Sequence, residues 1–127
     1  MNNLVYVDGF VLVVPKKNVP AYKKMAQLGG KIWKKHGALQ YFECRGDDLS
    51  PNMGGMEILT FPKLTKLKPT ETVWFSFIVY KSKAHRNAVN SKVMKDPAMN
   101  DPKNKDMKMP FDMKRMSFGG FKSVINL

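Results

Sequence analysis

Residues 72–80 are apolar on both of the faces that a β-strand would present. Alternate residues of a strand point to opposite sides of the sheet. One side here would carry Val73, Phe75, Phe77 and Val79, and the other Trp74, Ile78 and Tyr80. Residues 4–14 repeat the pattern, with Val7 and Val11 opposed to Tyr6 and Phe10. An antiparallel sheet with one face in water would alternate apolar with polar residues. We therefore expect a sheet that is covered on both sides.

The order of predicted elements is strand, helix, strand, strand, helix, strand. Strands are expected at 4–14, 38–45, 72–80 and 115–125, and a short helix or edge strand at 61–67. The first helix begins after Asn18 and ends before Gly37; the second begins after Ser82 and runs to Lys95. We expect Asn18 and Ser82 to cap these helices with their side chains. The order predicts an α+β fold of the ferredoxin-like βαββαβ type, with an antiparallel four-stranded sheet and two helices on one face.

A second copy of the chain is the simplest cover for the remaining sheet face. Two helices reached by right-handed crossovers cover only one face of such a sheet. Packing two sheets through their open faces would give a dimeric α+β barrel. We expect residues 1–127 to form one domain of this kind and to work as a homodimer.

Glycines mark places where the backbone is expected to depart from regular packing. The pair Gly29-Gly30 within the first helix predicts a close approach to the sheet. Gly119-Gly120 in the last strand predicts a bulge or a bend, and Gly9 is a candidate for another bulge.

The chain carries a formal charge of +12, from 22 Lys and Arg against 10 Asp and Glu. Such an excess suggests polyanionic partners. However, 19 of the 22 cations are Lys, spread along the chain in short pairs, whereas bidentate readout of bases favours Arg. Residues 72–78 also lack the basic and glycine start of an RNA-recognition strand. We therefore expect a solvated lysine surface and consider nucleic-acid binding unlikely.

We recognise no targeting signal in the sequence and therefore expect the cytoplasm by default. No apolar run approaches the roughly 18 residues of a membrane helix, and the start lacks the pattern of a secretory signal. The single cysteine, Cys44, allows no intrachain disulfide, and we expect it to act as a small hydrophobic residue. We predict a cytoplasmic protein that does not enter a membrane.

Several segments, in order along the chain, resemble a known bacterial family. They are YVDGF at 6–10, WKKHGAL at 33–39, ETV at 71–73, AHR at 84–86 with VM at 93–94, MPFD at 109–112, KRM at 114–116 and GGF at 119–121. This pattern, running from about residue 5 to 125, resembles the YbaA-like family of unknown function. The resemblance implies a dimeric ferredoxin-like α+β barrel, in agreement with the two-faced strands. It implies no particular reaction.

Asp8 and His85 are the candidates for proton transfer. Asp8 lies between Tyr6 and Phe10 on one face of an apolar strand, where burial would raise the pKa of its carboxyl group. The alternative is that Asp8 bonds to nearby amides or to an Arg. His85 opens the second helix beside Arg86, where the pair could bind an anion or move a proton. The alternative is that His85 packs against the helix and Arg86 pairs with an acid.

Arg86, Tyr80 and Arg115 are the candidates for holding a ligand. Arg115 would supply a charge and Tyr80 a hydroxyl donor. His36 at the end of the first helix is expected to act as a structural cap. The two histidines have no carboxylate at metal-site spacing, so we predict no metal site, and no motif calls for a cofactor.

Two functional hypotheses remain open from the sequence. In the first, a homodimer binds a small, acidic metabolite and could carry out cofactor-independent proton transfer or oxygenation. In the second, it is a non-catalytic regulatory or stress-related dimeric module with a packed interior. The sequence does not decide whether the protein is an enzyme.

Overall fold

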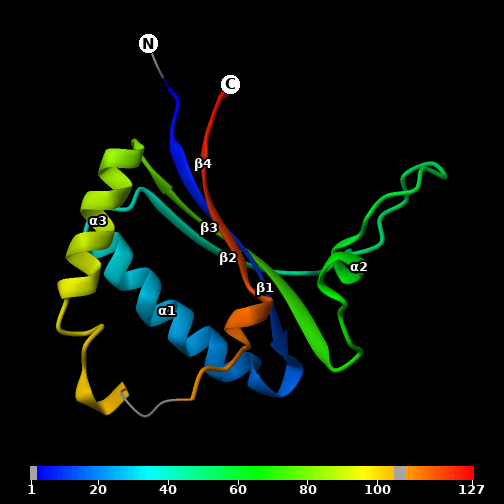
Figure 1. Ribbon diagram of the computed structural model, residues 1–127, viewed down its shortest axis with the longest axis horizontal. Helices are drawn as coiled ribbons and strands as arrows, with labels where there is room; N and C mark the ends of the chain where they lie inside the picture. Colours follow the sequence, from blue (N-terminus) through cyan, green and yellow to red (C-terminus); the bar gives the residue numbers. More distant parts are fainter. Residues whose placement is uncertain (1–2, 105–107) are drawn as a thin grey trace.

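The computed structural model describes residues 3–104 and 108–127 (Figure 1). The main elements are β1 (Tyr6–Pro15), α1 (Val19–Lys35), β2 (Gln40–Arg45), α2 (Phe61–Thr65), β3 (Glu71–Tyr80), α3 (Lys83–Lys95) and β4 (Ser117–Lys122). Single 3-10 turns occur at Lys16–Asn18, Pro102–Asn104 and Met113–Arg115. The strands form one sheet in the order β2-β3-β1-β4, and every neighbouring pair is antiparallel. This is the predicted ferredoxin-like α+β arrangement.

The two long helices cover one face of the sheet and leave the other open. Figure 1 shows α1 and α3 on one side of the strands and α2 on the opposite side. The register places Tyr6, Asp8, Phe10, Leu12 and Val14 of β1 beside the even-numbered residues of β3. These residues face the helices and supply most of the core. Its buried members include Leu12, Val14, Val19, Tyr22, Ala26, Ile32, Ile78, Tyr80, Val89 and Val93.

The opposite face carries the odd-numbered residues of β1, β3 and β4 and the even-numbered residues of β2, and we call it the open face. Phe42 and Phe77 stack there with ring centroids 4.8 Å apart. Phe75 and Phe121 are about half exposed or more, at 49% and 62%. Phe121 also lies over Gly9 and Gly119, which leave space for its ring. Both faces of the central strands are therefore apolar, as predicted, and a single chain covers only one of them fully.

Two of the predicted glycine features have different outcomes. A Cβ at Gly30 would lie 2.8 Å from the Tyr41 ring, so the predicted close approach of α1 to the sheet is confirmed. A bulge at Gly9 or at Gly119-Gly120 is wrong, because the pairing of β1 with β3 and β4 continues without an interruption; the alternative of a bend at Gly119-Gly120 stays a prediction. Gly120 instead leaves room for the Tyr6 side chain, which crosses it on the helix side.

The helix ends agree with the sequence at Ser82 but not at Asn18. The Ser82 hydroxyl accepts a hydrogen bond from the His85 backbone N–H at 3.0 Å, as predicted for a cap. Asn18 occupies the cap position of α1 but makes no side-chain cap bond. Its amide nitrogen donates instead to the Pro110 carbonyl at 3.0 Å, which ties the chain before β4 to the start of α1.

The last strand is shorter than predicted. It covers Ser117–Lys122, and Arg115 belongs to a 3-10 turn before it. Residues beyond Lys122 continue with Val124 and Ile125 mostly exposed. β-branched residues favour strands, but beyond Lys122 the pairing with the β1 side continues only as far as the Ser123 backbone N–H, which donates to the Val5 carbonyl at 2.9 Å. Within the described ranges, none of the helices is both long and apolar enough to cross a membrane.

The C-terminal ends of the two long helices are joined through Asp96. His36 ends α1, and its Nε2 lies 2.6 Å from the Asp96 carboxylate, which also bonds to the Lys35 ammonium at 3.3 Å. The Ala98 backbone N–H donates to the other carboxylate oxygen at 2.8 Å. The His36 bond, followed by that of Ala98, lowers the pKa of Asp96 to about 2. His36 thus acts as the predicted structural cap, with a carboxylate as its partner.

Replacing Asp96 with Asn should lower stability near neutral pH and remove part of the acid sensitivity. A folded-state pKa below the unfolded value stabilises the protein above the unfolded pKa, and this contribution is lost as pH falls toward the folded pKa. The difference in unfolding free energy between wild type and Asp96→Asn should therefore shrink as the pH falls from about 4 to about 2. Urea unfolding across this range measures it. A difference that did not change with pH would contradict the assignment.

Candidate functional site

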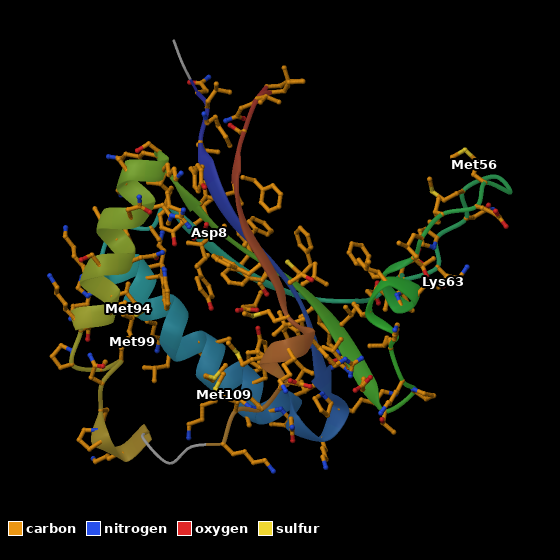
Figure 2. The ribbon with its side chains drawn as sticks, viewed as in Figure 1. Asp8, Met56, Lys63, Met94, Met99 and Met109 are labelled. Carbon is orange, nitrogen blue, oxygen red and sulfur yellow. The ribbon has the colours of Figure 1, made fainter. Side chains whose placement is uncertain are left out.

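Asp8 and Arg86 form an ion pair between the sheet and α3. The Arg86 Nη1 donates to the Asp8 carboxylate at 2.9 Å, and the Asp8 side chain is only 3% exposed. Figure 2 shows Asp8 on the helix side of the sheet. The Arg86 guanidinium also lies 5.0 Å from the centre of the Tyr6 ring. Asp8 lies on a buried face, as predicted, and its partner is an Arg, one of the alternatives that the sequence left open.

Tyr80 and His85 complete this cluster, but in different ways. Tyr80 is fully buried, and its hydroxyl bonds to Asp8 and lies 3.3 Å from the Asn90 side-chain oxygen. The His85 ring meets Tyr80 edge-on, with centroids 6.0 Å apart. Its Nδ1 accepts the Lys81 backbone N–H at 2.9 Å, so Nδ1 acts as an acceptor there. Four of the five predicted site residues are therefore neighbours.

Burial and the Arg86 charge act on Asp8 in opposite directions. Burial, the larger effect, raises the pKa of the Asp8 carboxyl group, while the charge and hydrogen bond of Arg86 lower it. The Arg86 Nε is buried and has no hydrogen-bond partner among the described residues. An unpaired buried donor costs about 1–3 kcal/mol. The pair is thus held at some cost, and access to Asp8 from solvent is closed by Arg86 and Tyr80.

Arg115 lies at the other end of the sheet, away from this cluster. Its Nη1 donates to the Glu71 carboxylate at 2.5 Å and its Nη2 to the Thr65 carbonyl at 2.9 Å. Glu71 begins β3, whereas Tyr80 ends it. The bond to Arg115 lowers the pKa of Glu71. Arg115 therefore joins β4 to α2 and β3, and the structure does not bring it together with the other predicted ligand residues.

Glu43 is the centre of a second polar cluster, which the sequence reading did not single out. Its Oε2 accepts hydrogen bonds from the Tyr22 hydroxyl at 2.7 Å and from the Ser76 hydroxyl. Its Oε1 accepts the Tyr41 hydroxyl at 2.9 Å. Three elements, α1, β2 and β3, supply these donors. The available signal was the alternation in β2, which places Tyr41, Glu43 and Arg45 on the helix side.

The tyrosines of this cluster are held in the protonated, donating state. Burial is the largest cause that raises the pKa of Tyr22 and of Tyr41, and both are raised further by the Glu43 carboxylate. A neutral hydroxyl donates one hydrogen bond. Each tyrosine therefore stays committed to Glu43 at physiological pH, which fixes the direction of the carboxylate.

A cleft of about 980 Å³ opens beside Glu43, between α1 and β2. Tyr41, Trp74 and Glu43 form its inner wall, and Ala26, Gln27 and Gly30 of α1 form another side. Its cations are Lys23, Lys31 and Lys34 from α1 and Arg45 from β2. None of these four cations forms a salt bridge with a carboxylate in the part of the chain that the structure describes.

Other candidates have simple outcomes. Cys44 is exposed on the open face, rather than buried as expected for a small hydrophobic residue. Within residues 3–104 and 108–127, no group of three His, Cys, Asp or Glu side chains could hold a metal ion.

Removing Arg86 should destabilise the protein more at pH 8 than at pH 5. Breaking a buried ion pair by removing one partner costs about 3–5 kcal/mol; we expect about 3 kcal/mol for Arg86→Met, because Arg86 is partly exposed. Without Arg86, burial alone acts on Asp8 and raises its pKa further. A raised folded-state pKa favours the fold below the unfolded value and costs stability as pH rises. Chemical denaturation at both pH values, compared with wild type, tests this, and an equal loss at both would show that Asp8 is not the affected group.

Comparisons with known proteins agree with the fold and with the family resemblance. Residues 5–113 match the family model described as Protein of unknown function (DUF1428). The chain is 41% identical over 121 residues to the Uncharacterized protein YbaA of Escherichia coli (strain K12), and equally to that of Shigella flexneri. These matches cover 95% of this chain and 97% of each relative.

Two solved structures share the fold at low sequence identity. One is a nipsnap family protein with unknown function from Agrobacterium tumefaciens, with a TM-score of 0.51, 18% identity, and coverage of 94% of this chain and 87% of that one. The other is a dimeric ferredoxin-like protein from an uncultured marine organism, with a TM-score of 0.50, 13% identity, and coverage of 97% and 99%. The two structures show the fold and the sequence matches show the family: this chain has a ferredoxin-like fold and belongs to the DUF1428 family of proteins of unknown function.

Proposed function

We propose that this protein binds a small anionic metabolite in the cleft between α1 and β2, and that it does so as a homodimer. The observation that carries the proposal is the set of four cations, Lys23, Lys31, Lys34 and Arg45, around one cleft. Ligand sites are concave and mostly apolar, with a few polar groups that fix orientation. Here Tyr41 and Trp74 offer aromatic surface, and Glu43 offers a fixed acceptor.

The two arginines expected to bind the anion are already engaged. Arg86 pairs with Asp8, and Arg115 pairs with Glu71. A ligand anion would have to compete with a carboxylate of the protein at either one. None of the four cleft cations forms a salt bridge with a carboxylate among the described residues. A ligand anion could therefore bind them without displacing an acidic side chain. We therefore keep the anionic ligand that was inferred from the sequence, but we place its binding site in the cleft rather than at Arg86 and Arg115.

Asp8 and His85 remain candidates for proton transfer under a stricter condition. A substrate could reach Asp8 only if Arg86 moved aside, because Arg86 and Tyr80 both bond to its carboxylate. We therefore propose binding as the primary function. The non-catalytic dimeric module stays the alternative, and the burial of Asp8 against Arg86 is the observation that favours it.

The homodimer is supported by the open face. It exposes Phe42, Phe75 and Phe121 on one face of the sheet, and large contiguous apolar patches mark interaction sites. A solved structure with the same fold is described as dimeric. In a two-fold dimer the same patch is used on both subunits, so the open face of one copy would pack against the open face of the other.

Anion binding is tested by a thermal-shift screen with citrate, 2-oxoglutarate and glucose 6-phosphate. We expect at least one of them to raise the melting temperature of the wild type, since a ligand at 100 times its Kd stabilises a protein by about 2.7 kcal/mol. The double variant Lys23→Glu and Lys31→Glu should lose this shift. The matched double variant Lys24→Glu and Lys92→Glu carries the same charge change outside the cleft and should keep it. Equal shifts in both variants would exclude the cleft as the site.

Dimerisation is tested by sedimentation equilibrium of Phe75→Asp. A charge placed in the covered face of a dimer must be desolvated without a partner, so the variant should become monomeric at micromolar concentration. Leu28→Asp on α1, where Leu28 is 46% exposed, is the matched control and should stay dimeric. A wild-type protein that sediments as a monomer would refute the dimer outright.

A further inference from the structure

The segment between β2 and α2 projects away from the rest of the molecule. We call residues 46–60 the arm. Figure 1 shows that the arm, together with α2, lies on the side of the sheet opposite α1 and α3, and Figure 2 places Met56 toward its outer end. Gly54 and Gly55, with φ of 66° and 84°, form the turn at which the arm reverses direction. The arm therefore extends into the space on the open-face side.

The arm is unusually apolar for a segment that its own chain does not cover. Met56 is 65% exposed and Leu59 is 68% exposed. Met53 and Ile58 are also exposed, as are Phe61 and Leu64 of the adjoining α2. Full burial of one such side chain is worth about 1.5–3 kcal/mol. The arm thus carries enough apolar surface to stabilise a contact with another molecule.

The arm also differs in charge from the rest of the chain. It contains Asp47, Asp48 and Glu57 and no Lys or Arg, although the whole chain has 22 cations and only 10 acids. The remaining residues therefore hold all 22 cations against seven acids. Interfaces place opposite charges together, which steers association and disfavours wrong partners. The surface with the complementary charge is that of this same protein.

The base of the arm adjoins the open face directly. Leu64 and Thr65 of α2 share a trough of about 540 Å³ with Val11 and Ser117, which belong to the open face, and with Lys66, Lys68 and Lys114. Gly46 lies against Leu49 and against Val73 of β3. Any molecule that covers the open face must therefore lie beside the arm.

We propose that the arm is a clasp that packs onto a second copy of this chain when the two open faces meet. The inference rests on the proposed homodimer and adds a second contact region to it. Because a two-fold interface is reciprocal, each subunit would be held by the other's arm. The acidic and apolar side chains of the arm would lie against the lysine-rich surface of the partner.

The test compares two double variants by sedimentation equilibrium over a range of concentrations. Met56→Ser with Leu59→Ser removes apolar surface from the arm. Met94→Ser with Leu28→Ser makes the same chemical change at sites of similar exposure on α3 and α1. We expect the arm variant to raise the dimer dissociation constant at least about tenfold, which corresponds to 1.4 kcal/mol, and the helix variant to leave it unchanged. All four residues are exposed, so circular dichroism should show intact folding in both variants.

Hydrogen exchange gives a second reading on the wild type. Amides of the arm should be protected at concentrations above the dissociation constant and exposed on dilution. A dimer of unchanged affinity in the arm variant, or an arm that exchanges freely within the dimer, overturns the clasp but leaves the homodimer standing. A monomeric wild type overturns both. Equal weakening by the two double variants also overturns the clasp, since it would reflect a general effect of surface polarity.

Discussion

The antiparallel pairing of β1 with β3 is the constraint on which the rest of the structure depends. It runs without interruption from Tyr6 opposite Tyr80 to Pro15 opposite Glu71. A slip of one residue would turn every side chain of a strand to the other face. A slip of β1 would bring Asp8 to the open face, away from Arg86, and a slip of β3 would bring its phenylalanines beneath the helices. The same register therefore decides where the polar clusters lie and which apolar face is left without a cover.

Much of the fold could be predicted, because strand periodicity and helix caps are local signals. The two-faced pattern of β3, the cap at Ser82 and the approach allowed by Gly30 each have a sequence signal that spans only a few residues. Asn18 shows the limit, since its side chain bonds to Pro110, which is 92 residues away. The end of β4 differs from the prediction for a related reason: Val124 and Ile125 have strand propensity, but a strand also needs continued pairing with a neighbour, and propensity alone does not show where the pairing of β4 with β1 stops.

The candidate site was harder to predict, because its parts are distant in sequence and its charges depend on partners. A carboxylate on an apolar strand is a visible anomaly, so Asp8 could be found, and an Arg was among its stated alternative partners, although the sequence did not identify which Arg. Glu43 is flanked by Cys44 and Arg45 and reads as part of an exposed edge strand. Only the placement of α1 over β2 brings Tyr22 to it and gathers the lysines of α1 near Arg45. Similarly, nothing near Arg115 in the sequence announces Glu71 as its partner.

The distribution of charge bears on what the basic surface is for. A nucleic-acid surface would gather Arg and Lys on one continuous face, without acids, and would keep apolar groups few. In this chain the open face is aromatic, and the arm beside it is acidic. The cations instead lie on α1 beside the cleft, around the trough and along α3. Such a division keeps the aromatic open face next to an acidic segment, which favours self-association over a polyanion at this face. A small anion, in contrast, needs only the few cations of the cleft, and these lie on the helix side, where a second copy on the open face would leave them accessible.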